Sequence, residues 1–227
     1  MPIETEGLAD RLERVRHRVA DAARAAGRDP SEITTIVVTK FHPASLVREL
    51  ATLGVRDVGE NRAQEAAGKA AELTDLDVRW HFIGQLQTNK AKAVRHFASA
   101  VHSVDRPGLV AALDGGDRVL DCFLQLALTD DPGRGGVPIP ELPALAERVL
   151  AAPGLRLRGV MAVAPLGVEP RRAFATVREA SESLRALAPD ATDISAGMSG
   201  DFGDAIAEGA THLRIGTAIT GKRPEHA

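Results

Sequence analysis

The sequence predicts an α/β fold and, within that class, a parallel (β/α)8 barrel. Eight short runs of β-branched or apolar residues have the character of strands, and segments with apolar residues three or four apart separate them. Strands that alternate with helices pair in parallel through right-handed crossovers, and eight of them can close a barrel. An open doubly wound sheet would typically carry a glycine-rich turn after its first strand, whereas this strand ends in Lys-Phe-His-Pro. We expect one domain over residues 1–227, a length that α/β barrels commonly have.

The elements follow one another along the chain in a regular order. A helix over residues 7–26 precedes the first strand, and Gly27 is suited to end it. The predicted strands are residues 34–39, 55–58, 78–83, 100–104, 119–128, 157–163, 192–195 and 211–215. The predicted helices between them are residues 43–53, 62–73, 88–97, 107–113, 142–150, 170–187 and 201–208. The longest irregular stretch, residues 129–140, predicts a mobile lip of the barrel and not a domain linker.

Composition and charge exclude several classes of function. The net charge is −3 and the charges are dispersed, so we expect neither a nucleic-acid-binding face nor a basic membrane-binding face. The N-terminal residues are charged, which does not fit a secretory signal, and no apolar run approaches the ~20 residues of a membrane span. The single cysteine, Cys122, cannot form an intramolecular disulfide and is expected to be a reduced core residue. The sequence therefore predicts a soluble cytoplasmic protein.

The loops after the seventh and eighth predicted strands have the chemistry of an anion site. In an α/β barrel, functional residues gather at the carboxyl ends of the strands, and phosphate is often held after strands seven and eight. The segment SAGMSGD (195–201) supplies Gly197 and Gly200, whose backbone N–H groups could approach an anion, the Ser199 hydroxyl and the start of a helix. The segment RIGTAITG (214–221) repeats this pattern. Either loop alone could be a simple turn, but together they predict a phosphate cradle.

Lys40 follows the first predicted strand and has three interpretations. A lysine at a strand end is most often a solvated surface charge. At a barrel mouth, opposite a phosphate cradle, Lys40 could instead bind phosphate as a point charge. It could also form a Schiff base with the aldehyde of pyridoxal 5′-phosphate (PLP), using a pKa lowered by partial burial. The position of Lys40 makes the last two interpretations worth testing.

Six stretches carry a family resemblance: VTKFHP, GENRAQE, WHFIGQLQTNK, HSVDR, RGVMAVAP and ISAGMSGDFGDAIAEGATHLRIGTAITG. They run in order from Val38 to Gly221, and on them the sequence resembles the pyridoxal phosphate homeostasis proteins. The resemblance implies a single TIM barrel of the alanine-racemase type, with an extra N-terminal helix and without the second domain of that enzyme. It implies PLP as the cofactor and a role in vitamin B6 and amino-acid homeostasis.

The same resemblance implies roles for individual residues. Lys40 would be the Schiff-base lysine. Arg214 would approach the pyridine nitrogen, where its fixed positive charge would keep that nitrogen unprotonated and weaken the ring as an electron sink. His81 would line the site near the ring, although it could equally be a strand histidine with a satisfied hydrogen bond. The complete implied set of cofactor-binding residues is Lys40, Asn61, His81, Met198, Ser199, Gly200, Arg214, Gly216 and Thr217.

Three positions depart from the usual family pattern. Arg62 follows the GEN triplet where an aromatic or small apolar residue is common, and His102 stands where an acidic residue is usual. The loop TDDPGRGGV replaces a version that contains lysine and serine. These departures concern the rim of the implied site.

The composition favours a carrier of PLP over an enzyme. Racemisation needs acid–base groups on both faces of the substrate Cα, and alanine racemases use the Schiff-base lysine and a tyrosine. This chain has no tyrosine, and Cys122 has no second cysteine to form a catalytic pair with. We therefore expect a non-catalytic, monomeric PLP-binding protein, with PLP-dependent apoenzymes as recipients and no metal.

Two other functions remain open at this stage. The first is a low-activity PLP-dependent racemase in which His81 or a water chain acts as the second base. The second is a phosphosugar isomerase-like barrel in which Lys40 only contacts substrate, with Glu60 as the one obvious general base at a strand end.

Overall fold

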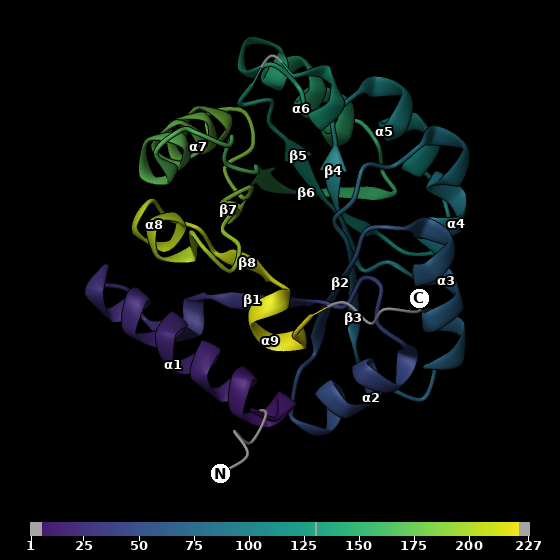
Figure 1. Cartoon of the computed structure of the whole chain (residues 1–227). Helices are drawn as coiled ribbons and strands as arrows, with labels where there is room; N and C mark the ends of the chain where they lie inside the picture. The colour runs from purple at the N-terminus through teal and green to yellow at the C-terminus, as the bar shows by residue number, and fades with distance from the viewer. Residues whose placement is uncertain (1–5, 130, 223–227) are drawn as a thin grey trace.

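The computed structural model of the chain describes residues 6–129 and 131–222, and these residues form a closed barrel of parallel strands (Figure 1). The strands pair in chain order from β1 to β8, and β8 pairs with β1 to close the barrel. Their bounds are β1 Thr34–Val38, β2 Asp57–Glu60, β3 Arg79–Phe82, β4 Ala100–Val104, β5 Leu120–Gln125, β6 Leu155–Met161, β7 Asp193–Ser195 and β8 His212–Ile215. The predicted (β/α)8 barrel is confirmed.

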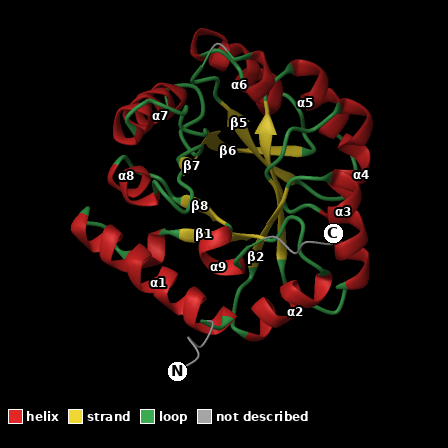
Figure 2. Cartoon of the chain, viewed as in Figure 1, coloured by secondary structure: helices red, strands yellow, loops and turns green. Residues whose placement is uncertain are grey.

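Helices surround the barrel, as Figure 2 shows. They are α1 Leu8–Ala25, α2 Ala44–Thr52, α3 Ala63–Glu72, α4 Ala91–Phe97, α5 Pro107–Leu113, α6 Leu142–Leu150, α7 Pro170–Leu184, α8 Phe202–Ala207 and α9 Thr217–Thr220. The short 3-10 helices are η1 Pro30–Glu32, η2 Thr88–Lys90, η3 Pro132–Arg134 and η4 Ile139–Glu141. The predicted extra N-terminal helix is α1, which packs against α8 and α9. No helix among the described residues is long and apolar enough to cross a membrane.

Several boundaries differ from the sequence prediction for local reasons. The second strand was expected at residues 55–58, but the Val55 N–H donates to the Leu50 carbonyl and so completes the end of α2. Strand pairing starts two residues later, where Asp57 pairs with Arg79. The expected helix over residues 88–97 divides into η2 and α4. The four-residue helix α9 was not predicted because it is too short to show a helical period.

Two separate interiors result from the alternation of side chains along each strand. Side chains on the outer face of the barrel form the large apolar core beneath the helices; Phe82 and Cys122 belong to it. Cys122 is a free, buried cysteine in this core, as expected, and burial raises the pKa of its thiol to about 12. Inside the barrel lies a smaller apolar cluster of Ala100, Phe123 and Met161. The buried polar side chains that share this interior with it are His81, His102, Ser195 and Arg214.

Candidate functional site

Three adjacent strands bring Lys40 and the two glycine loops to one side of the barrel mouth. Ser195 of β7 pairs with His212 of β8, and Ile215 of β8 pairs with Val37 of β1. The loops that follow β7, β8 and β1 are therefore consecutive around the mouth. Barrel closure makes the first strand a neighbour of the eighth, so Lys40 projects from beside the loops predicted to form the phosphate cradle.

The backbone on both sides of Lys40 is fixed. Lys40 is exposed, and its Nζ lies 5.8 Å from the centroid of the Phe41 ring. Phe41 has a positive φ of 68°, a conformation that non-glycine residues adopt only when contacts support it. One such contact is the Phe41 N–H, which donates to Glu65 Oε1 over 2.7 Å. On the other side, the Thr39 N–H donates to the Gly59 carbonyl over 2.9 Å.

Glu60, Glu65 and Lys69 form an ionic cluster that contacts the backbone of Thr39 and Phe41, on either side of Lys40. The Lys69 ammonium donates to Glu60 Oε1 over 2.7 Å, to Glu65 Oε1 over 2.8 Å and to the Thr39 carbonyl over 2.9 Å. The Thr39 hydroxyl also donates to Glu60. Burial raises the pKa of Glu60 even though Lys69 and Thr39 oppose that effect. The cluster ties the end of β1 to α3 and thereby sets the place from which Lys40 projects.

The sequence did not predict this cluster, although it carries one signal for it. Glu65 and Lys69 are four residues apart, a spacing that pairs opposite charges on a helix face. Nothing in the sequence showed that Glu60 would join them. Because its carboxylate points toward Lys69 and Thr39, Glu60 is poorly placed to serve as a general base at the mouth, which counts against the isomerase alternative.

The glycine loops differ in what their glycines do. Gly197 has a φ of 93°, and a Cβ there would lie 2.8 Å from Ala205 Cβ, so the fold itself requires this glycine. A Cβ on Gly200 would meet nothing within 4 Å, so the packing of the chain leaves this position open. Gly216 caps α9 and lies beside β1, because a Cβ there would be 3.5 Å from Val38 Cβ.

The remaining loop residues line the same side of the mouth. Met198 is 40% exposed, Ser199 is half-buried and Thr217 is exposed at the first position of α9. The Met198 N–H donates to the Asp201 carboxylate over 2.6 Å, which closes the turn before α8. That carboxylate places a negative charge beside the loop, a feature that the sequence prediction of an anion cradle did not include.

Arg214 reaches into the barrel beneath the mouth. Its Nη1 donates to Ser195 Oγ and its Nη2 to the Ala162 carbonyl, both over 2.7 Å. Burial lowers the pKa of Arg214 to about 10, so the guanidinium still carries its charge at neutral pH. No carboxylate among the described residues lies within 4 Å of it. A buried cation without an anionic partner is costly, so the site favours an additional hydrogen-bond acceptor here.

Asn61 directly follows β2, and His81 lies on β3, the next strand around the barrel. The buried Oδ1 of Asn61 accepts no hydrogen bond from the described residues. His81 on β3 is buried inside the barrel, with Nε2 2.8 Å from Asp57 Oδ1 and Nδ1 2.9 Å from His102 Nε2. Both ring nitrogens are thus engaged. The geometry matches the alternative interpretation of His81 as a strand histidine with satisfied hydrogen bonds.

Two of the three departures from the family pattern, Arg62 and the loop after β5, fall on the rim as expected. The third, His102, was expected there too but is fully buried inside the barrel, where it lies between His81 and Ser195. The Arg62 guanidinium carbon stands 4.6 Å from the centroid of the Phe41 ring, within the range of a cation–π contact. Residues 131–137 fold back over the mouth: the Val137 N–H donates to the Gln125 carbonyl over 2.8 Å, and Gln85 Nε2 donates to the Gly133 carbonyl over 2.9 Å. The mobility of this lip stays a prediction.

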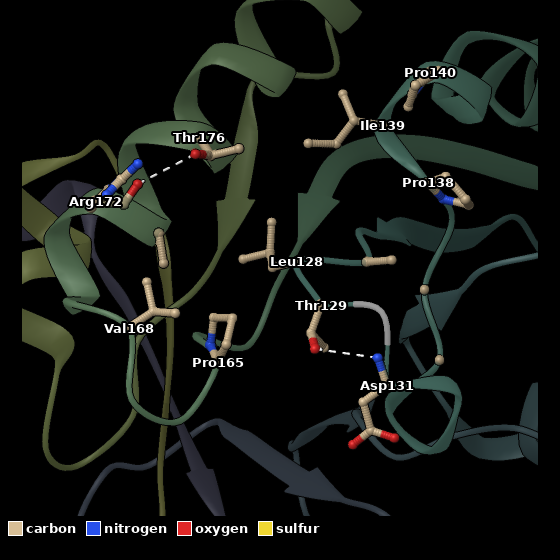
Figure 3. A pocket seen from close by; sticks show the side chains of 14 residues that line it. Leu128, Thr129, Asp131, Pro138, Ile139, Pro140, Pro165, Val168, Arg172 and Thr176 are labelled. Atoms are coloured by element: carbon tan, nitrogen blue, oxygen red, sulfur yellow. Dashed lines mark hydrogen bonds between the residues drawn. The ribbon is translucent and has the colours of Figure 1, made fainter.

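A cavity of about 660 Å³ opens between this lip and the start of α7 (Figure 3). Leu128, Thr129 and Asp131 line one side, and Val168 and Arg172 line the other. None of the nine predicted site residues borders this cavity, and it contains no lysine. Its chemistry therefore gives no reason to place the cofactor there. The candidate site remains the part of the barrel mouth that the carboxyl ends of β7, β8, β1, β2 and β3 form.

Comparisons with known proteins identify the family of the chain. Residues 11–224 match the family model described as the alanine racemase N-terminal domain. The chain is 43% identical to the pyridoxal phosphate homeostasis protein of Corynebacterium glutamicum, covering 87% of this chain and 93% of the relative. It is 42% identical to the protein of the same name from Pseudomonas aeruginosa, covering 95% of this chain and 96% of the relative. The structure of PipY from Synechococcus elongatus with PLP bound superposes with a TM-score of 0.83 at 36% identity, covering 95% of this chain and all of that chain.

Proposed function

The chain belongs to the family of pyridoxal phosphate homeostasis proteins, and on that premise we propose that it holds PLP through a Schiff base to Lys40 and serves PLP homeostasis without catalysis. The observation that carries the proposal is the arrangement of the mouth. Lys40, the two glycine loops and the buried Arg214 project from three consecutive strands, β1, β8 and β7.

Two polar groups at the mouth support a fit to this cofactor. The buried Asn61 Oδ1 lacks a donor among the described residues. The Arg214 guanidinium has no carboxylate of the described residues within 4 Å, and the charge of Asp201 acts on it only from farther away. A planar ring that carries a phosphate, a hydroxyl and a basic nitrogen supplies partners for such groups. When bound, PLP supplies an aldehyde for a lysine and, in enzymes, an electron sink.

Each predicted residue then has a part in holding the cofactor. Lys40 provides the amine, and the cluster of Glu60, Glu65 and Lys69 fixes the backbone from which that amine projects. Arg214 donates toward the ring nitrogen, which weakens the ring as an electron sink. The loops with Met198, Ser199, Gly200, Gly216 and Thr217 would hold the phosphate, and Asn61 and His81 would lie near the ring.

The described side chains favour storage of PLP over turnover. A racemase needs a second base across from the lysine, and the chain has no tyrosine to provide it. The imidazole of His81 has both nitrogens engaged by Asp57 and His102, so it has no free nitrogen in this arrangement to take a substrate proton. The Cys122 thiol is buried in the outer core, with its pKa raised to about 12.

An absorption titration tests the proposal. Purified protein is titrated with PLP, and the Schiff-base band and the borohydride-reduced adduct are followed in wild type, Lys40→Ala and the control Lys90→Ala. Lys90 lies near the same mouth beside Asn61, so it reports on nonspecific adducts. We expect the band and the adduct to disappear only in Lys40→Ala. An adduct of unchanged yield in Lys40→Ala would refute the role of Lys40.

A second measurement separates the carrier from a low-activity racemase. The PLP-loaded protein is incubated with L-alanine or L-serine in heavy water, and exchange of the α-hydrogen is followed by NMR. The carrier proposal predicts exchange no faster than with free PLP, whereas exchange at catalytic rates would support the enzyme.

The wider setting of this function is part of the same proposal. We take residues 1–227 to form one domain that acts as a monomer in the cytoplasm and passes PLP to PLP-dependent apoenzymes. Gel filtration tests the monomer, and reactivation of a PLP-free enzyme by the loaded protein, with a trap for free PLP present, tests direct transfer.

A further inference from the structure

A line of hydrogen-bonded side chains crosses the inside of the barrel beneath the mouth. At its upper end, Arg214 on β8 donates from Nη1 to Ser195 Oγ on β7 over 2.7 Å. His102 Nδ1 on β4 lies 2.9 Å from the same hydroxyl oxygen. His102 Nε2 lies 2.9 Å from His81 Nδ1 on β3, and His81 Nε2 lies 2.8 Å from Asp57 Oδ1 on β2. Side chains from five strands thus form one continuous chain.

The lower end of this chain is at the opposite end of the barrel from the mouth. Asp57 and Arg79 are the first residues of β2 and β3, and Arg79 Nη2 donates to Asp57 Oδ2 over 2.6 Å. Burial opposes ionisation of Asp57, but the hydrogen bonds from His81 and Arg79 outweigh it, and the pKa of Asp57 is lowered. The line therefore joins a buried cation to a carboxylate that is anionic at neutral pH.

The groups at the two ends of the line, a guanidinium that only donates and a carboxylate that only accepts, assign a direction to every hydrogen bond between them. Burial, with the nearby His81 and Arg214, holds the pKa of His102 well below its usual range, so His102 is neutral and has one donor and one acceptor nitrogen. Arg214 can only donate, so the Ser195 oxygen accepts from it and the Ser195 hydroxyl gives its own proton to His102 Nδ1. His102 Nε2 then carries the ring proton and donates to His81 Nδ1. The Asp57 carboxylate can only accept, so His81 Nε2 donates to it. Every donor in this arrangement meets an acceptor.

We propose that Ser195, His102, His81 and Asp57 form a positioning chain that fixes the orientation of the Arg214 guanidinium and links its buried charge to the anion at the barrel floor. Only the view that Arg214 faces PLP rests on the proposed function. The line of hydrogen bonds from Arg214 to Asp57 is present in the protein without cofactor. Phe123 supports the chain by stacking on His102, with ring centroids 4.3 Å apart and an interplanar angle of 12°.

The other groups that face the chain lie outside it. The His212 ring centroid stands 6.5 Å from that of His81 and 6.3 Å from that of His102, while its Nδ1 pairs with the Thr211 hydroxyl at 2.8 Å. Asp193 and Arg158 form an ion pair at 2.7 Å and are the charged groups, besides His81 and Asp57, that affect His212. His212 is a half-buried histidine beside the line of bonds but not bonded to it, so it provides a control.

The first experiment uses the protein without cofactor. Nitrogen-15 NMR of the imidazole rings at neutral pH distinguishes the two tautomers of a neutral histidine. We expect both His81 and His102 to carry their proton on Nε2. A proton on Nδ1 of His102 would reverse the bond to Ser195 and would overturn the proposal.

The second experiment breaks the chain far from Arg214. Asp57→Asn keeps the size of the side chain but removes the anion, and Asp121→Asn is its control, because Asp121 pairs with Arg156 at 2.5 Å without touching the chain. His102→Leu removes the central link, and His212→Leu is its control. The readouts are the guanidinium nitrogen signals of Arg214 in the free protein and the dissociation constant for PLP.

We expect Asp57→Asn and His102→Leu to shift the Arg214 signals and to weaken PLP binding by roughly tenfold, the size of a lost hydrogen bond to a charged group. The two control variants should match wild type. Unchanged Arg214 signals and PLP affinity in Asp57→Asn would overturn the proposal. If His102→Leu does not fold, the Arg214 signals of Asp57→Asn and the histidine tautomers of wild type still test the proposal. If wild type itself does not bind PLP, the proposed function fails, while the NMR signals continue to test the chain.

Discussion

Replacing His212 by glutamine should remove much of the acid sensitivity of folding. Burial, with His81 and Arg158 and against Asp193, lowers the pKa of His212 to about 4, compared with 6.5 for an ordinary histidine. Between these two values the unfolded chain binds a proton that the folded chain does not. Stability from neutral His212 is therefore complete above about pH 6.5 and is lost as the pH falls toward 4.

The size of this effect follows from the two pKa values. They differ by about 2.5, and each unit of pKa is worth about 1.4 kcal/mol, so the full effect is on the order of 3 kcal/mol. At about pH 4.5 the folded protein is still mostly unprotonated at His212, and roughly 2 kcal/mol of this stability has been lost. The buried neutral His102 should add to the loss in wild type and in the variant alike.

Urea unfolding followed by the fluorescence of Trp80 measures the free energy of unfolding at about pH 7 and about pH 4.5. We expect His212→Gln to lose roughly 2 kcal/mol less than wild type between these conditions. His17→Gln is the control, because the side chain of His17 is 74% exposed on α1. An equal loss of stability in wild type and His212→Gln would refute the reasoning.

Two further substitutions test the buried contacts that shape the mouth and the barrel wall. Lys69→Met leaves Glu60 buried without its cation and should cost about 3–5 kcal/mol of unfolding free energy. Its control is Arg48→Met, in the exposed pair with Asp75, which should have little effect. Equal effects of the two substitutions in urea unfolding would contradict the role of the cluster. Gly159→Ala places a Cβ 1.8 Å from the Asp193 carbonyl at a φ of 151°, so this variant should fail to accumulate as folded protein. Gly108→Ala, a helical position where a Cβ meets nothing within 4 Å, is its control; normal expression and circular dichroism of Gly159→Ala would contradict that expectation.

Much of the fold and the outline of the site could be predicted because they depend on local patterns. β-branched runs alternating with helical periods identified the barrel, and parallel strands in a barrel place all their carboxyl ends at one mouth. Lys40 and the two glycine loops could therefore be assigned to that mouth from their places after the first, seventh and eighth strands. The boundaries of β2 were missed because Val55, although apolar, ends a helix turn.

Contacts within the mouth could not be predicted in the same way. Closure of the predicted barrel makes the first strand a neighbour of the eighth, and the structure pairs Val37 with Ile215. The sequence did not show that Glu60, Glu65 and Lys69 would fix the segment that carries Lys40. The sequence also does not show which glycines the fold requires. A Cβ at Gly197 would collide with Ala205, whereas a Cβ at Gly200 would meet open space. These distinctions depend on packing between segments and have no signature in the local sequence.

The sequence by itself determined the α/β barrel, the residues at its mouth and the absence of a tyrosine to act as a second base. Only the tertiary structure decided that His81 bonds to His102, 21 residues away, and that His102 bonds to Ser195, 93 residues away. A strand pattern shows which side chains face the inside of a barrel, but the stagger of the closed strands decides which of them meet across it. The line of bonds from Arg214 to Asp57 exists because closure brings five inward-facing side chains within hydrogen-bond distance.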